Sequence, residues 1–454
     1  GKGANLGELV RAGIPVPDGF VISSATYDEF LEGAGLSPQL AAISHGLAVD
    51  DGAALQQAAD RMRALVLGAD VPAEIARGVL DAYHALRTDQ TREGTPLVAV
   101  RSSATAEDSA QTSFAGMFES FLNVSGDDAL LDAVRHCWAS GFSPRLLFYR
   151  AKQGLKAAPS IAVVVQRMVQ SDKSGVIFSV DPATRNPDHL VIEAAWGLGE
   201  VVVGGQVTPD RYVVEKSTGR VLQRVAARKT FLLTRDPSTG GNVRVDLADD
   251  PRQMQLVLDD RELAQLVAMA TKVEAHYGRP QDMEFAIEGG EAYLVQSRPI
   301  TTLDGPAARA ATGVAEGATA GTASGATAAP PARGALLVKG LGASPGVGGG
   351  RARVIARAVD GASLQAGEVL VAPMTSPDWV PVMRRAVAIV TDAGGMTSHA
   401  AIVSRELGIP CVVGTGNATS LIRTGDAVTV DGTAGTVVEG APPPAAAAPQ
   451  RVTA

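Results

Sequence analysis

The sequence predicts a mixed α+β domain joined by a flexible linker to a smaller α/β domain. A chain of 454 residues exceeds what one hydrophobic core usually organises, so two or three domains are expected. From Asp304 to Gly334, Ala, Gly, Thr and Pro alternate without a hydrophobic period, which indicates the linker. On both sides of this stretch, short runs rich in Val and Ile alternate with helical patterns.

Before the linker, the hydrophobic periods predict a mixed α+β architecture over residues 1–302. The expected strands are 98–100, 161–166, 175–180, 190–193 and 292–296. The expected helices are 24–31, 129–140 and 261–277.

After the linker, placed at 303–336, the patterns predict a compact α/β domain over 337–440 and a disordered Ala- and Pro-rich tail over 441–454. The expected strands are 351–355, 368–372, 388–391, 411–413 and 427–430, with a helix at 400–407.

The composition predicts a globular cytoplasmic protein. It is 46% hydrophobic and 19% charged, and its net charge of -8 without a long basic run favours neither nucleic acid nor an anionic membrane as a partner. Cys137 and Cys411 lie in separate apolar stretches and are expected to be buried thiols. No apolar run is long enough to span a bilayer. Because the chain begins with Gly1 instead of Met, a few preceding residues are expected to be missing.

Of the six histidines, His399 has a sequence context that indicates a chemical role. An apolar strand ends shortly before it, Gly394 and Gly395 turn the chain, and Thr397 or Ser398 can cap a following helix. The N–H groups and the positive end of that helix would stabilise a phosphoryl group on the imidazole. The glycines would leave room for a nucleotide to approach. The alternative is an ordinary surface or capping histidine.

Two cationic residues in the N-terminal part suit phosphate binding. Lys2 lies in a glycine-containing turn before a helix, and Arg101 lies at the end of an apolar strand, where its fork can hold two phosphate oxygens. The loop Ser113–Met117 follows and could close over a nucleotide. The alternatives are an ordinary turn at Lys2 and an ion pair of Arg101 with Glu107 or Asp108.

A hairpin is predicted near the end of the first domain, with 283–286 and 293–299 as two edge strands. Alternation places Glu284 opposite Met283 and Phe285, and puts Gln296 and Arg298 on a common face. The oxygens of Glu284 and Gln296 could hold Mg²⁺ against nucleotide phosphates while Arg298 neutralises charge. A solvated polar face is the alternative.

Residues 339–440 resemble the phosphohistidine domain of the phosphoenolpyruvate-utilising enzymes. The resemblance rests on the stretches 342–346, 375–383 and 392–410. Met396-Thr397-Ser398 is closer to the pyruvate phosphate dikinase version of the motif, whereas Glu406–Pro410 is more like phosphoenolpyruvate synthase. The resemblance implies a small swivelling domain in which His399 carries the phosphoryl group.

Residues from Gly1 to about Thr302 resemble the ATP-grasp-like nucleotide domain of phosphoenolpyruvate synthase and its relatives. This resemblance assigns phosphate contacts to Lys2, Arg101 and Arg298, a nucleotide-contacting hydroxyl to Ser120, the adenine-bordering hinge to Gln166, Met168 and Val169, and Mg²⁺ to Glu284 and Gln296.

The two resemblances imply a phosphoenolpyruvate synthase-like phosphotransferase that converts ATP to AMP and phosphate and passes one phosphoryl group through His399 to an acceptor such as pyruvate. A pyruvate-binding barrel needs about 250 residues, more than follow Gly440. We therefore expect the acceptor site on a separate polypeptide or on a part lost from a truncated chain. The alternatives are an antibiotic-type, rifampin phosphotransferase-like dikinase with a small-molecule acceptor, and a non-catalytic phosphocarrier or regulatory subunit.

Overall fold

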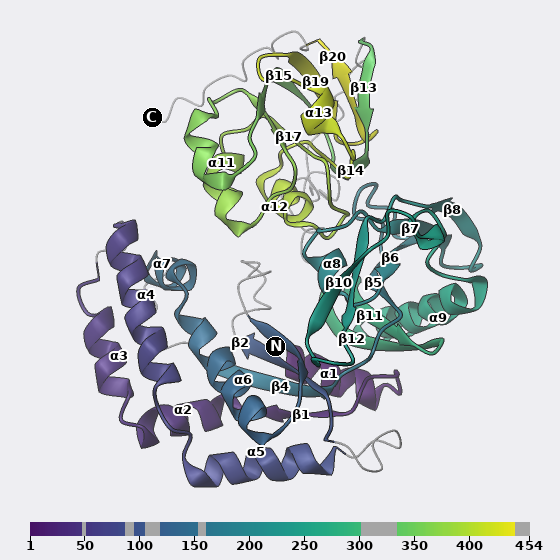
Figure 1. Ribbon diagram of the computed structural model, residues 1–454. Helices are drawn as coiled ribbons and strands as arrows, with labels where there is room; N and C mark the ends of the chain where they lie inside the picture. Colours follow the sequence, from purple (N-terminus) through teal and green to yellow (C-terminus); the bar gives the residue numbers. More distant parts are fainter. Residues whose placement is uncertain (48–50, 87–94, 105–118, 153–159, 301–333, 441–454) are drawn as a thin grey trace, which may run out of the picture.

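The computed structural model shows two α/β regions in contact with each other (Figure 1). It describes residues 1–47, 51–86, 95–104, 119–152, 160–300 and 334–440. The predicted tail and most of the predicted linker lie outside these ranges. No helix within them is both long and apolar enough to cross a bilayer. Cys137 and Cys411 are buried and form no disulfide with each other, as predicted.

The first part of the N-terminal region is an antiparallel sheet with the strand order β1-β4-β2-β3. Its strands are β1 (Gly19–Ile22), β2 (Val98–Ala104), β3 (Ser120–Val124) and β4 (Ile161–Arg167). Its helices are α1 (Lys2–Arg11), α2 (Ser24–Gly33), α3 (Ser37–Ser44), α4 (Gly52–Leu67), α5 (Ala73–Ala85), α6 (Asp127–Ala139) and α7 (Pro144–Lys152), with a 3-10 turn η1 (Ser140–Phe142). Val163 and Val165 of β4 pack into the core that contains Trp138, whereas Val164 packs on the other face with Leu6 of α1.

The second part is an antiparallel sheet with the order β12-β11-β5-β6-β7-β8. Its strands are β5 (Lys173–Phe178), β6 (His189–Trp196), β7 (Asp210–Glu215), β8 (Val221–Val225), β11 (Gln281–Glu288) and β12 (Glu291–Pro299), and a hairpin of β9 (Phe231–Arg235) and β10 (Asn242–Asp246) lies beside them. The other elements are α8 (Glu200–Val203), η2 (Pro251–Gln253) and α9 (Asp260–Tyr277). The predicted hairpin is present, but only half of the edge prediction is right: β12 lies at the edge, whereas β11 also pairs with β5.

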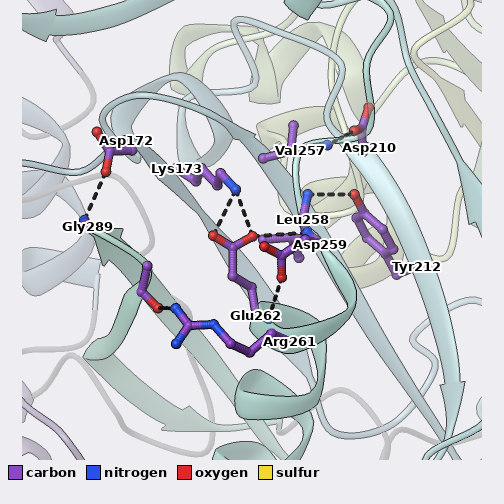
Figure 2. Close-up of polar contacts among 11 residues, drawn as sticks. Asp172, Lys173, Asp210, Tyr212, Val257, Leu258, Asp259, Arg261, Glu262 and Gly289 are labelled. Carbon is purple, nitrogen blue, oxygen red and sulfur yellow. Dashed lines mark hydrogen bonds and ion pairs between the residues drawn. The ribbon is translucent and has the colours of Figure 1, made fainter.

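Helix α9 covers one face of this sheet and is fixed at its first turn (Figure 2). The Asp259 side chain accepts the Glu262 N–H and the Glu262 carboxylate accepts the Asp259 N–H, a capping box that starts the helix. Lys173 of β5 donates to both Glu262 oxygens at 2.7 Å. The first turn of the helix is therefore tied to the sheet through Glu262.

The C-terminal region is built on a sheet with the order β13-β20-β19-β15-β16-β17-β18-β14, whose members β15 to β18 run parallel. Its strands are β13 (Leu336–Lys339), β14 (Leu341–Ser344), β15 (Val347–Val354), β16 (Val369–Ala372), β17 (Ala388–Thr391), β18 (Cys411–Val413), β19 (Ala427–Asp431) and β20 (Thr436–Glu439). Its helices are η4 (Ala358–Ser363), η5 (Pro377–Trp379), α11 (Val380–Met383), α12 (His399–Leu407) and α13 (Ala418–Leu421). The five predicted strands and the predicted helix are all present.

An apolar cluster joins the two regions. It includes Val176 of β5 and Val201 of α8 together with Met396 and Ala400 of the C-terminal region. In Figure 1, α12 lies on the side of the C-terminal region that faces the N-terminal half. The helix that carries His399 therefore lies next to the packed contact between the two regions.

Candidate functional site

Arg101 of β2 connects the two N-terminal sheets. Its guanidinium donates to the Gln296 side-chain oxygen at 2.9 Å and to a Glu284 oxygen at 3.1 Å, and its other nitrogen donates to the Val295 carbonyl at 2.8 Å. The side chains of Arg101 and Glu284 are only 12% and 19% exposed. A charged fork in this setting interacts more strongly than an exposed one, because water screens it less.

A bulge in the hairpin creates one of these contacts. Glu284 pairs with Gln296 and Phe285 pairs with Leu294, so Val295 is left outside the register. A bulge of this kind bends the strand and redirects a backbone group, and here the carbonyl of Val295 accepts from Arg101. The predicted phosphate-binding residue Arg101 and the predicted metal-binding residues Glu284 and Gln296 are therefore brought together. The alternative partners of Arg101, Glu107 and Asp108, lie outside the described residues.

A second acidic residue, missed by the sequence analysis, belongs to the same polar face. Asp282 stands opposite Arg298 in the β11–β12 register and accepts from its Nε at 2.8 Å. Gln296 donates to Glu284 at 3.0 Å two pairs further along the register. Strand alternation was the signal that could have found Asp282, because it lies two residues before Glu284.

Lys2 and Ser120 lie beside Arg101. The Lys2 ammonium donates to the Ser102 carbonyl at 3.2 Å, and Ser120, which is exposed, stands directly opposite Arg101 in the β2–β3 register. One detail of the prediction is wrong: Lys2 is the first residue of α1, not part of a turn that precedes the helix. The candidate loop Ser113–Met117 lies outside the described residues.

The predicted hinge borders a small apolar cluster. Met168 donates its N–H to the Leu97 carbonyl at 2.8 Å, and its side chain is buried, as is that of Val169. The cluster around it consists of Ala99, Met168 and Leu198 with the partly buried Leu97, Leu122 and Leu233. The Gln166 side chain, by contrast, is directed away from this cluster. It is 3% exposed, and its amide donates to the Pro17 carbonyl at 3.2 Å. In this structure the side chain of Gln166 therefore links β4 to the segment that precedes β1.

His399 is the first residue of α12, one residue before the predicted helix start at Ala400. Ser398 is the cap, because its hydroxyl accepts the Ala401 N–H at 3.4 Å. The Thr375 hydroxyl lies 2.9 Å from Nδ1 of His399 and so fixes the orientation of the ring. The helix ends at Gly408, whose φ of 67° is a conformation that glycine adopts without strain.

The turn before His399 contacts the N-terminal region through Glu193, whose role the sequence analysis did not find. Both Glu193 oxygens accept the Met396 N–H, at 2.9 and 2.8 Å. Burial raises the pKa of Glu193 to about 7, while the Met396 N–H, Arg211 and Arg405 oppose that shift. The expectation that Gly395 leaves room for a nucleotide is not met in this arrangement, because Glu193 lies against it.

The fold and the site define a protein with a polar, arginine-bearing cluster where two sheets meet and a histidine-bearing domain packed on one of them. The family model described as pyruvate phosphate dikinase, AMP/ATP-binding domain, matches residues 1–317. The model described as PEP-utilising enzyme, mobile domain, matches residues 364–435. The chain belongs to the pyruvate phosphate dikinase and phosphoenolpyruvate synthase family, which confirms the resemblance seen in the sequence.

The most informative relatives are named phosphoenolpyruvate synthases. A probable phosphoenolpyruvate synthase of Methanothermobacter thermautotrophicus is 45% identical over 441 residues, which cover 97% of this chain and 61% of the relative. The phosphoenolpyruvate synthase of Pyrococcus furiosus is 45% identical over 480 residues, covering 97% of this chain and 56% of the relative. The chain thus spans little more than half the length of these relatives. Among solved structures, the D-cycloserine synthetase DcsG matches 66% of this chain and 61% of its own at 12% identity, with a TM-score of 0.25 that carries no argument.

Proposed function

We propose that this chain is the ATP-binding and phosphohistidine part of a phosphoenolpyruvate synthase-like phosphotransferase, in which His399 receives a phosphoryl group from ATP. The observation that carries the proposal is the cluster of Arg101, Glu284 and Gln296 between the two sheets. Phosphoryl transfer depends mainly on positioning and on neutralising charge. The names of the relatives support the same activity.

ATP is proposed to lie across the junction of the sheets, in an ATP-grasp-like manner. Lys2, Arg101 and Arg298 would neutralise its phosphates, and Ser120 would contact it from the end of β3. Its adenine would lie against the apolar cluster around Met168, bordered by the backbone of the 166–169 hinge. Flat apolar walls with a few polar groups are typical of such sites.

The donor set on β11 and β12 fits Mg²⁺. Asp282, Glu284 and Gln296 present oxygens on one face, and hard oxygen ligands are those that Mg²⁺ prefers. In the structure Arg101 donates to Glu284 and Gln296, and Arg298 donates to Asp282, so the ion would take the place of these donors. When bound, the ion would neutralise charge on the nucleotide phosphates.

His399 is proposed to attack through Nε2. In the tautomer in which Nδ1–H donates a hydrogen bond to the Thr375 hydroxyl, the lone pair lies on Nε2. Nε2 forms a bond to the β-phosphorus of ATP, and AMP leaves with the electron pair of the broken bond. Water then releases the γ-phosphate as inorganic phosphate, so one phosphoryl group stays on His399. The N–H groups at the start of α12 favour the anion there.

The acceptor is proposed to be pyruvate, bound on a segment or a separate polypeptide outside these 454 residues. The 303–336 linker would let the histidine domain swivel between the two sites. A rifampin phosphotransferase-like dikinase and a non-catalytic phosphocarrier are the competing functions.

The proposal is tested by incubating the chain with β-labelled ATP and Mg²⁺. We expect acid-labile label on the wild type and none on His399→Ala, and with γ-labelled ATP we expect label only in released phosphate. Absence of label on the wild type would leave the non-catalytic reading. The labelled protein is then incubated with pyruvate and the remaining part of the enzyme. Loss of the label distinguishes a phosphoenolpyruvate synthase-like function from a dikinase with another acceptor.

A further inference from the structure

Glu193 is a buried carboxylate that no step of the proposed transfer uses. It lies in the middle of β6, and it is 0% exposed. Its partner is the Met396 N–H of the C-terminal region, three residues before His399. A buried carboxylate requires compensating hydrogen bonds, and here one comes from the turn that carries the histidine.

The sheet registers place Glu193 in line with the nucleotide site. Glu284 of β11 pairs with Val176 of β5, and Val176 pairs with Glu193 of β6. Directly paired residues of antiparallel strands put their side chains on the same face. Glu193 and Glu284 therefore share one face with a single strand between them, a separation of about 10 Å at the backbone. The Met396 turn is consequently held beside the proposed phosphate site and not at a remote surface.

The contact is close on both sides. A Cβ at Gly395 would meet the Glu193 Oε2 at 2.5 Å and the Pro209 ring at 2.8 Å. A Cβ at Gly205, at the end of α8, would meet the Cβ of Ser398 at 2.8 Å. Such fits leave no space for a side chain, so the two surfaces are shaped for each other.

Arg405 of α12 joins the same contact from the other side. It donates to the Met396 carbonyl at 2.7 Å and to the Ala343 carbonyl at 3.0 Å. Burial lowers its pKa, while the Cys411 thiol and the carboxylates of Glu193 and Asp282 act in the opposite direction. Arg405 therefore interacts electrostatically with Glu193 and with Asp282 of the proposed nucleotide site. It also donates to the carbonyl of Met396, whereas the N–H of Met396 donates to Glu193.

We propose that Glu193 is a positioning residue that holds the phosphohistidine domain in the pose in which His399 faces bound ATP. This inference rests on the proposed function, because it assumes that His399 receives the phosphoryl group. The contact must be broken when the domain leaves, and the hydrogen bonds that Glu193 accepts from the backbone can then be exchanged for bonds to water, which suits a reversible attachment. In the proposed pose Glu193 holds the Met396 turn and not the nucleotide, so its loss is expected to act on the docking step.

The test compares Glu193→Leu with the wild type and with Glu262→Gln. Glu262 is a control matched in residue type and burial, since it is 3% exposed in the same region, but it lies in the first turn of α9 and its carboxylate accepts from Lys173 of β5 (Figure 2). We expect Glu193→Leu to slow labelling of His399 by β-labelled ATP about 10- to 150-fold, the contribution of a hydrogen bond to a charged group. ATP affinity should be unchanged. Glu193→Gln keeps an acceptor oxygen and should restore most of the rate, and Glu262→Gln should label like the wild type.

Docking is measured separately, by energy transfer between dyes on Ser217→Cys and Val359→Cys, two exposed positions on opposite sides of the contact. Glu193→Leu should lower the transfer efficiency. Gly395→Ala attacks the same contact from the C-terminal region and should act in the same direction, so a folding defect of one variant does not decide the outcome.

Equal labelling rates, or slower labelling with undiminished energy transfer, would overturn the positioning role. If the wild type takes no label, the proposed function fails. The energy-transfer comparison then still decides whether Glu193 holds the two regions together.

Discussion

Arg101→Lys keeps the positive charge at the junction of the two N-terminal sheets but removes the planar guanidinium group. The guanidinium makes three hydrogen bonds across the junction of the sheets, two of them to Glu284 and Gln296. A lysine ammonium can replace one such bond but cannot bridge two oxygens in the same plane. We expect a loss of about 1.5–3 kcal/mol, the contribution of a charge-assisted hydrogen bond, which is about 10- to 150-fold in ATP affinity.

The assay is ATP binding by calorimetry, with Arg11→Lys as the control. Arg11 lies on α1, its side chain is 77% exposed, and it pairs with Glu8 within the helix. Exposed ion pairs of this kind contribute little, so Arg11→Lys should bind ATP like the wild type. If Arg101→Lys binds ATP as tightly as the wild type, the reasoning is wrong, because it requires the geometry of the guanidinium, and not only its charge, for ATP binding.

Three further predictions follow from other contacts. Thr375→Val should slow labelling of His399 about 2- to 10-fold, because the imidazole ring loses one hydrogen bond at Nδ1. An unchanged labelling rate would mean that this hydrogen bond does not orient the ring. Burial raises the pKa of Glu193 to about 7 in the docked pose, whereas an exposed glutamate titrates near about 4.3. Docking therefore takes up a proton, so energy transfer in the wild type should fall as the pH rises from about 4.3 to about 7 and should level off above that, whereas Glu193→Gln should show no such fall. Equal profiles of the two proteins would contradict this. Lys229→Met leaves the buried Asp210 without its cation and should lower the free energy of unfolding in urea by about 3 kcal/mol. A loss below about 1 kcal/mol would show that the backbone N–H donors to Asp210 are enough to stabilise its buried carboxylate.

Local patterns in the sequence predicted much of the fold. The strands 388–391 and 411–413 have the predicted bounds, because both are short, fully buried runs with turn residues on either side. Helix α12 begins one residue earlier than predicted, at His399, because Ser398 is its cap. Capping chemistry is local and can be read directly from the sequence.

The site was predictable as far as strand alternation and resemblance reach. Arg101, Glu284 and Gln296 are brought together as expected. The bond between Glu193 and Met396 joins residues 203 positions apart, and no local period marks such a partner. The place of β11 inside the sheet was missed for the same reason, since pairing with β5 depends on the order of distant strands.

The most direct test of the account is the position of the phosphoryl group on the protein. After reaction with ATP and Mg²⁺, phosphorus NMR and peptide mass spectrometry should find it on Nε2 of His399. Phosphate on Nδ1 would contradict the role given to Thr375, and phosphate on any other residue, or none at all, would contradict the central claim.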